Sequence, residues 1–163
     1  MLRNATPEDA GRIAEIYNHY IENTVITFED TAVTAAIMAD RIAQIQEKGR
    51  PFIVYEENGE TLGYAYASTW RARPAFNITL ETSVYIDVKH LGQGIGSRLY
   101  AQLIERTRAI GIHSLIGVIA LPNDVSRRLH QKTGFDLIGN FRKTGQKFGR
   151  LVDVEFWQLR LQP

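Results

Sequence analysis

Apolar residues recur with helical spacing in two segments near the start of the chain. Residues 6–9, Thr-Pro-Glu-Asp, combine a capping threonine, a proline suited to a first turn and two acids that favour the positive end of a helix dipole. Apolar side chains then follow every three or four positions, which predicts a helix to about Glu22. A second helix is predicted from about Thr34 to Lys48, with Gly49 ending it.

Shorter apolar runs predict a set of β-strands. The predicted strands are residues 1–5, 51–57, 61–69, 78–88, 114–120, 135–143 and 151–161. Asn58 and Gly59 separate the second strand from the third and predict a hairpin with a tight turn. The last two strands are expected to be joined by a loop around Gly145 and Gly149. Residues 25–29 are expected to form a loop or a short extended piece.

Two further helices complete the predicted pattern. The glycine-rich residues 92–96 lead into a helix that ends near Ile110, and Asn123 opens a short helix that ends before Gly134. The order β-α-α-β-β-β-α-β-α-β-β predicts an α/β or α+β fold with one mixed sheet. Because no repeat, low-complexity stretch or linker interrupts it, we expect residues 1–163 to form a single domain.

Composition narrows the possible functions. The 163 residues contain no cysteine, which excludes disulfides, thiolate metal sites and an acyl-cysteine intermediate. The formal net charge is +1 and no block of Lys and Arg is present, so we do not expect a nucleic-acid partner. The polar residues 1–9 predict no secretory signal, and no apolar run approaches the ~20 residues of a membrane helix. We therefore expect a cytoplasmic protein.

The segment Gly92-Gln93-Gly94-Ile95-Gly96 indicates a candidate phosphate site. A strand, a glycine-rich turn and a helix start would direct free N–H groups and a partial positive charge at a ligand. The spacing alone also fits a tight turn whose glycines only permit positive φ. A Walker loop is excluded because Ser97 and Arg98 follow Gly96, and a dinucleotide fingerprint has different spacing. A coenzyme A loop is the third possibility.

Residues 84–96 resemble the acetyl-CoA motif of the GNAT superfamily of N-acetyltransferases, usually written Gln/Arg-x-x-Gly-x-Gly/Ala. Leu91 stands where that motif has Gln or Arg, so one side-chain contact is lost. Five further segments resemble the phosphinothricin acetyltransferase branch, which includes enzymes acting on methionine sulfoximine and methionine sulfone. These segments are residues 17–21, 70–73, 79–85, 121–124 and 156–159. The resemblance implies a mostly antiparallel sheet flanked by helices and splayed at the acetyl-CoA site, acetyl-CoA as co-substrate, and no metal.

Glu81 is the candidate general base. It interrupts an otherwise apolar and hydroxyl-bearing strand, and a partly buried carboxyl group has a raised pKa that suits it to accept a proton near neutral pH. The alternative is a structural Glu at a strand edge, paired with Arg71 or Arg73. By resemblance, Glu81 stands at the position of the branch's catalytic glutamate.

His130 is the candidate partner of Glu81. By resemblance it occupies a position where many relatives carry a tyrosine that protonates the departing thiolate. The surrounding pattern is Asn123, Ser126, His130, Gly134 and Phe135. A histidine titrates in a range that suits either acid or base. The alternative is a surface histidine without a role. The other three histidines lack metal-ligand spacing.

The resemblance also implies the binding residues. Acetyl-CoA is expected to contact Val84, Tyr85, Ile86, Gly92, Gln93, Gly94, Ile95, Gly96, Ser97, Asn123 and Ser126, with a backbone N–H of residues 84–86 holding the oxyanion. The acceptor is expected to contact Phe28, Arg71, Ala72, Arg73, Glu81, Thr82 and Ser83. Two arginines can clamp an anionic group by forked hydrogen bonds, although solvated loop arginines are the usual alternative.

These residues predict an enzyme that acetylates the amine of a small anionic amino acid of the phosphinothricin, methionine sulfoximine or methionine sulfone type. Three alternatives remain: another small amine, a protein N-terminus or lysine, and a non-catalytic acyl-CoA sensor. The resemblance further implies a homodimer that uses residues 145–150 and 151–161.

Overall fold

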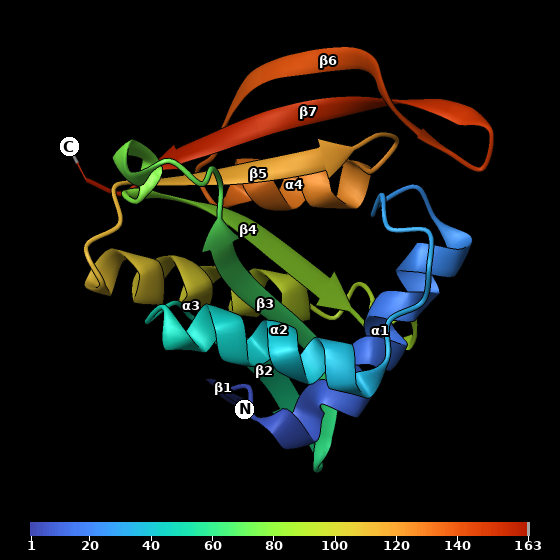
Figure 1. Cartoon of the computed structure of the whole chain (residues 1–163), viewed down its shortest axis with the longest axis vertical. Coiled ribbons are helices and arrows are strands. Elements are labelled where there is room, and N and C mark those ends of the chain that lie inside the picture. The colour runs from blue at the N-terminus through green and yellow to red at the C-terminus, as the bar shows by residue number, and fades with distance from the viewer. Residues whose placement is uncertain (163) are drawn as a thin grey trace.

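The computed structural model describes residues 1–162, so Pro163 of the expected domain lies outside the described part. One seven-stranded sheet has the order β1-β2-β3-β4-β5-β7-β6 (Figure 1). Its strands are β1 (Leu2–Asn4), β2 (Phe52–Glu57), β3 (Glu60–Thr69), β4 (Thr79–Ile86), β5 (Ser114–Ala120), β6 (Asp136–Lys147) and β7 (Arg150–Arg160). The helices are α1 (Ala10–Asn23), α2 (Ala35–Glu47), α3 (Ile95–Ala109) and α4 (Asp124–Lys132).

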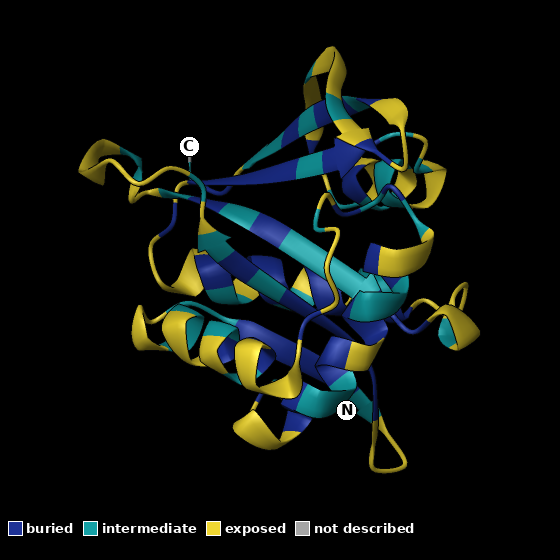
Figure 2. Cartoon of the chain, turned by 45° about the vertical axis from the view of Figure 1, so that its right-hand side comes forward, coloured by how far each residue is buried: buried dark blue, intermediate teal, exposed yellow. Residues whose placement is uncertain are grey.

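The helices cover both faces of the sheet. Side chains alternate along each strand, so Phe52 and Val54 of β2 pack with α1 and α2, whereas Ile53 between them packs with α3. Figure 2 shows the buried strands between helices whose outer sides are exposed. No helix within residues 1–162 is long and apolar enough to cross a membrane.

The sheet opens between β4 and β5. All its strand pairs are antiparallel except this one, which is parallel and extends only from Thr79–Thr82 to its partners in β5. β4 nevertheless stays paired with β3 as far as Ile86. The two parallel strands therefore diverge beyond Thr82, as Figure 1 shows. The mixed, mostly antiparallel and splayed sheet expected from the sequence is confirmed.

The joint between the last two strands differs from the sequence prediction. No loop surrounds Gly145, because β6 continues through it to Lys147 and a tight turn leads to Arg150. Phe148 and Gly149 both have positive φ in this turn, which suits a two-residue hairpin connection. Gly145 follows a register shift in β6 and has no positive φ. The sequence pattern predicts a turn at Gly145, but glycine is needed there because a side chain has no space, as described below.

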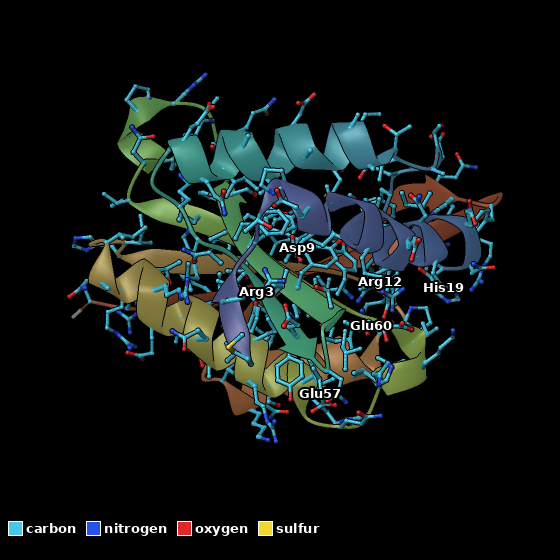
Figure 3. All side chains as sticks on the ribbon, turned by 90° about the horizontal axis from the view of Figure 1, so that it is seen from below. Arg3, Asp9, Arg12, His19, Glu57 and Glu60 are labelled. Atoms are coloured by element: carbon cyan, nitrogen blue, oxygen red, sulfur yellow. The ribbon has the colours of Figure 1, made fainter. Side chains whose placement is uncertain are left out.

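β4 also ends earlier than the sequence predicts. Val88 lies in a short 3-10 turn, residues 88–90, rather than in the strand. The side chain of Asp87 accepts a hydrogen bond from the N–H of Lys89 at 2.9 Å, which caps this turn. Arg12 of α1 forms an ion pair with Asp87 and another with Glu60 at 3.0 Å, and Figure 3 shows Arg12 and Glu60 close together. α1 thus anchors the start of the glycine-rich segment.

Candidate active site

A cavity of about 580 Å³ opens where β4 and β5 diverge. Of the residues predicted for the site, those that line it are Phe28, Glu81, Thr82, Ser83, Val84, Tyr85, Ile86, Gly92, Gly94, Ile95, Gly96, Ser97, Asn123, Ser126 and His130. Four predicted residues do not line it: Gln93, Arg71, Ala72 and Arg73. The structure thus brings most of the predicted residues together around one space, although they come from distant parts of the chain.

The backbone of β4 faces this gap. The N–H of Asp87 donates to the carbonyl of Leu62 on β3 at 2.9 Å, and successive residues of an antiparallel ladder direct their N–H and C=O groups to opposite sides. Val84 and Ile86 therefore direct theirs toward the gap. The Tyr20 hydroxyl donates to the Ile86 carbonyl at 2.5 Å, which fits this orientation. The N–H of Val84 is thus available to a molecule that lies between the strands.

The first turn of α3 forms another wall of the cavity. Gly92 and Gly94 have φ values of 79° and 77°, and Gly94 is the N-cap of the helix. A Cβ at either glycine would meet nothing within 4 Å, so glycine is required for its backbone conformation rather than for space. The free N–H groups of a helix start attract phosphate. Arg128 and Lys132 of α4 line the same cavity and add positive charge.

Glu81 lies on the face of the sheet that α1 and α2 cover. It shares this face with Tyr85, whose ring packs edge-on against Tyr17 of α1 at 5.0 Å. No ion pair or hydrogen bond to its carboxyl group occurs among residues 1–162, so the expected alternative of a pair with Arg71 or Arg73 is not found. Burial raises the pKa of Glu81. A carboxyl group of this kind is suited to take up a proton.

His130 lies on the opposite face and is only 4% exposed, which contradicts the alternative of a surface histidine. Its Nδ1 is 2.8 Å from the carbonyl oxygen of Ser126, which can only accept, so Nδ1 carries a proton. In the neutral ring, Nε2 then accepts from the hydroxyl of Tyr100 at 2.8 Å. Burial lowers the pKa of His130, against the effect of the bond to Ser126. The buried site therefore favours the neutral form of the ring.

Two residues that the sequence analysis did not identify hold this histidine. Tyr100 of α3 bonds both His130 and, at 2.6 Å, the Oγ1 of Thr82 on β4. Gly117 of β5 lies directly under the imidazole, because a Cβ there would overlap the ring atoms Nε2 and Cδ2. Tyr100 sits in the apolar pattern of α3 and Gly117 in an apolar strand, so nothing in the sequence marked either of them.

Thr82 and Glu81, which are adjacent in β4, thus serve different sides of the sheet. Thr82 belongs with Tyr100 and His130 on the α3 side, and Glu81 faces the α1 side. The gap between β4 and β5 connects the two sides. A proton acceptor and a hydrogen-bonded chain of hydroxyl and imidazole groups therefore flank one opening from opposite faces.

The predicted arginine clamp lies elsewhere. Residues 71–73 are exposed and precede β4, at the end of the strand opposite to the splay (Figure 1). The guanidinium group of Arg71 lies 4.7 Å from the centre of the Trp70 ring. Among residues 1–162, no cluster of three or more His, Asp or Glu side chains is arranged to hold a metal ion.

A parallel strand pair that opens onto a glycine-rich helix start, with an acid and a histidine on either side, suits a transferase that holds a phosphate-bearing donor and takes a proton from its acceptor. The family model of the acetyltransferase (GNAT) domain matches residues 2–156. The chain therefore belongs to the GNAT family, and it is an N-acetyltransferase.

Known relatives agree with this assignment. The chain is 39% identical to phosphinothricin N-acetyltransferase of Streptomyces viridochromogenes, over 96% of this chain and 85% of the relative. It is 37% identical to L-methionine sulfoximine/L-methionine sulfone acetyltransferase of Salmonella typhimurium, over 98% and 94%. A solved structure from Salmonella typhimurium, described as an acetyltransferase with its cofactor acetyl-CoA, superposes with a TM-score of 0.98 at 36% identity, covering 100% of this chain and 94% of that one.

Proposed function

We propose that this enzyme transfers the acetyl group of acetyl-CoA directly to the α-amine of a small anionic amino acid of the phosphinothricin, methionine sulfoximine or methionine sulfone type. The observation that carries the proposal is the placement of Glu81 and His130 on opposite faces of one opening in the sheet. The names of the relatives support the substrate class. Direct transfer is supported because the chain contains no cysteine to carry the acetyl group.

The cavity suits acetyl-CoA. The N–H groups of residues 92–97 can hold a pyrophosphate, and the N–H of Val84 can bind a chain that lies along β4. Asn123 caps α4 by accepting from the N–H of Ser126 at 3.1 Å and still lines the cavity, so it can serve both roles. When bound, acetyl-CoA supplies the activated thioester. Gln93 does not line the cavity, so only its backbone position in the loop supports its predicted contact.

Three groups of the protein then share the chemistry. Glu81 accepts the proton that the amine must lose, directly or through water. A backbone N–H of residues 84–86 donates to the carbonyl oxygen as negative charge develops on it. On the other face, the hydroxyl of Tyr100 or Thr82 gives a proton to the departing sulfur and regains one from solvent, while His130, which accepts at Nε2, holds the Tyr100 hydroxyl in place. The acceptor amine thus approaches from the α1 side, and the thiol leaves on the α3 side.

The acceptor side of the cavity is defined less completely. Phe28, Glu81 and Ser83 line the cavity on this side, which supports their proposed role. Thr82 lines the cavity from the α3 side, where its hydroxyl bonds Tyr100, so its predicted contact with the acceptor stays a prediction. The arginine clamp of residues 71–73 lies outside the cavity in this chain and stays a prediction.

We also propose that the enzyme acts as a cytoplasmic homodimer without a nucleic-acid partner. Its balanced charge and lack of cysteine support the location and the absence of nucleic acid. Large apolar side chains are exposed along β6, in the turn after it and at the start of β7: Leu137, Ile138, Phe141, Phe148 and Leu151. An exposed apolar patch of this kind is typical of a protein interface.

The proposed function is tested by measuring thiol release from acetyl-CoA with methionine sulfone, methionine sulfoximine, phosphinothricin, ordinary amino acids and a lysine peptide. Fast release with the first three is expected, and Glu81→Gln and His130→Ala should each reduce kcat by about 10²-fold or more. Release only with other amines would contradict the substrate class. Tight coenzyme A binding without any release would indicate a sensor.

A further inference from the structure

The segment Thr27-Phe28-Glu29, between α1 and α2, is joined to the far end of β6. Lys147 of β6 is 5% exposed, and its Nζ donates to the carbonyl of Thr27 at 2.7 Å. Burial lowers the pKa of Lys147, while Asp30 and Glu29 act in the opposite direction. Burying an ammonium group costs free energy unless hydrogen bonds or nearby opposite charges compensate for the lost water. Here its hydrogen bond attaches a loop of the cavity wall to the hairpin.

Phe28 lies directly on the backbone of Gly145. A Cβ at position 145 would lie 2.6 Å from Cε1 of Phe28, closer than side-chain atoms approach one another. Gly145 has no positive φ, so glycine is required there for space alone. Phe28 as a whole residue is nevertheless 44% exposed. One side of the ring therefore rests on β6, and the rest is available for contact.

Two other elements hold the same segment from the opposite side. Arg41 of α2 grips the carboxylate of Glu29 with two hydrogen bonds, of 2.9 and 2.5 Å. The hydroxyl of Tyr17 on α1 bonds both that carboxylate and, at 2.7 Å, the Oγ1 of Thr27. Contacts from α1, α2 and β6 thus fix three consecutive residues.

The fixed segment borders the acceptor side of the cavity. Tyr17, Thr27 and Phe28 all line it, and the Tyr17 ring contacts Tyr85, on the sheet face that carries Glu81. On the proposed function, this is the side from which the amine approaches the base. A flat aromatic ring here can contact the apolar part of an amino-acid side chain.

We propose that Gly145 and Lys147 are positioning residues for acceptor recognition, because they place Phe28 where it bounds the acceptor site. This inference rests on the proposed function and assigns the specificity-determining contact to Phe28. The residues on β6 do not touch the reacting atoms. Their effect should therefore appear in the KM for the acceptor and leave the KM for acetyl-CoA unchanged.

The test compares Gly145→Ala with Gly139→Ala, a change on the same strand where a Cβ would meet nothing within 4 Å. Gly145→Ala should raise the KM for methionine sulfone about tenfold, with the KM for acetyl-CoA unchanged, and Gly139→Ala should change neither. Lys147→Met keeps the aliphatic stem but removes the donor, so it should raise the acceptor KM in the same way.

A double-mutant cycle with Phe28→Ala makes the test specific. In the Phe28→Ala background, adding Gly145→Ala should have no further effect on the acceptor KM or on the free energy of unfolding, because the overlapping ring is gone. Independent, additive effects of the two changes would overturn the proposal. So would an effect on stability alone.

Failure of the inference is distinguishable from failure of the proposed function. If wild-type protein releases no thiol with any amine of the panel, the proposed function is refuted. The positioning role of Gly145 and Lys147 in acceptor recognition is then refuted as well. If wild type is active and Gly145→Ala behaves like Gly139→Ala, only the positioning role is refuted.

Discussion

At the scale of single residues, burial acts on Glu81 and His130 in the same sense, because it disfavours the charged form of each. The pKa of Glu81 is raised and that of His130 is lowered. The difference lies in their partners, since His130 is bonded at both ring nitrogens whereas the Glu81 carboxyl group has no bonded partner among the described residues. Glu81 is thus free to meet a substrate, and His130 is fixed.

The raised pKa of Glu81 predicts the pH dependence of catalysis. The base must be ionised to accept a proton, so kcat/KM should decrease as the pH drops through the pKa of Glu81. This pKa should lie above the ordinary 4.5 of a glutamate. The measurement is a pH profile of kcat/KM under subsaturating acceptor. Glu81→Gln should lose this acid limb along with most of the rate. A limb of the same pKa in that variant would assign it to another group.

Gly117 is predicted to be essential for the placement of His130. Gly117→Ala would force the imidazole away, which should destabilise the fold by ~1–3 kcal/mol and lower kcat more than either KM. Thermal unfolding and steady-state kinetics check this. Gly11→Ala is the control, since a Cβ at that helical position meets nothing within 4 Å: it should leave kcat and both KM values unchanged and should raise stability slightly, because alanine favours a helix more than glycine does. Equal effects of the two changes would contradict the prediction.

The two candidate catalytic side chains could be proposed from the sequence, but their surroundings could not. Glu81 stands out as an acid in an apolar strand, and His130 is identified by a motif. Tyr100 and Gly117 lie 30 and 13 residues before His130, and only the packing of α3 and β5 brings them to it. No periodicity marks a contact of this kind, because each residue also fits the pattern of its own element.

At the scale of elements, α3 depends on the backbone conformation of its N-cap. Gly94 holds φ at 77°, which an L-residue adopts at a cost of about 1 kcal/mol or more. The N–H groups of residues 95–97 are directed by this conformation. The ability of this helix start to bind an anion should therefore depend on the backbone conformation of Gly94.

Gly94→Ala is expected to raise the KM for acetyl-CoA several-fold and to leave the KM for the acceptor unchanged, because it disturbs only the wall made by α3. Initial rates with each substrate varied in turn measure this. Gly111→Ala imposes the same strain at a φ of 80° but outside the cavity, so it should lower stability without changing either KM. A similar rise in both KM values would show that the effect is not local.

Most elements follow from the chain's pattern of apolar residues, and the exceptions have physical causes. The sequence predicts a later end for β4 because Val88 is apolar like the strand before it, whereas Asp87 caps a short turn that begins there. β6 was ended too early because Gly145 was interpreted as a loop residue. Gly145 instead makes room for the ring of Phe28, which lies more than 100 residues earlier in the chain. Only the tertiary structure brings the two together.

At the scale of the whole molecule, the exposed apolar residues of β6 predict a dimer. Ile138→Asp and Phe141→Ser should each shift the protein toward the monomer, since each removes apolar area from the proposed interface. Sedimentation equilibrium over a range of concentrations measures the shift, and circular dichroism verifies that the variants fold. A wild-type chain that stays monomeric at high concentration would refute the dimer.

The divergence of β4 and β5 leaves an edge strand in the middle of a sheet. Edge strands carry unsatisfied hydrogen-bonding groups, and proteins usually cover or interrupt them. On the proposed function, bound acetyl-CoA would cover this inner edge and accept hydrogen bonds from it. Binding and folding would then be linked by mass action, so the free energy of unfolding should rise when acetyl-CoA is bound and fall again each time coenzyme A leaves.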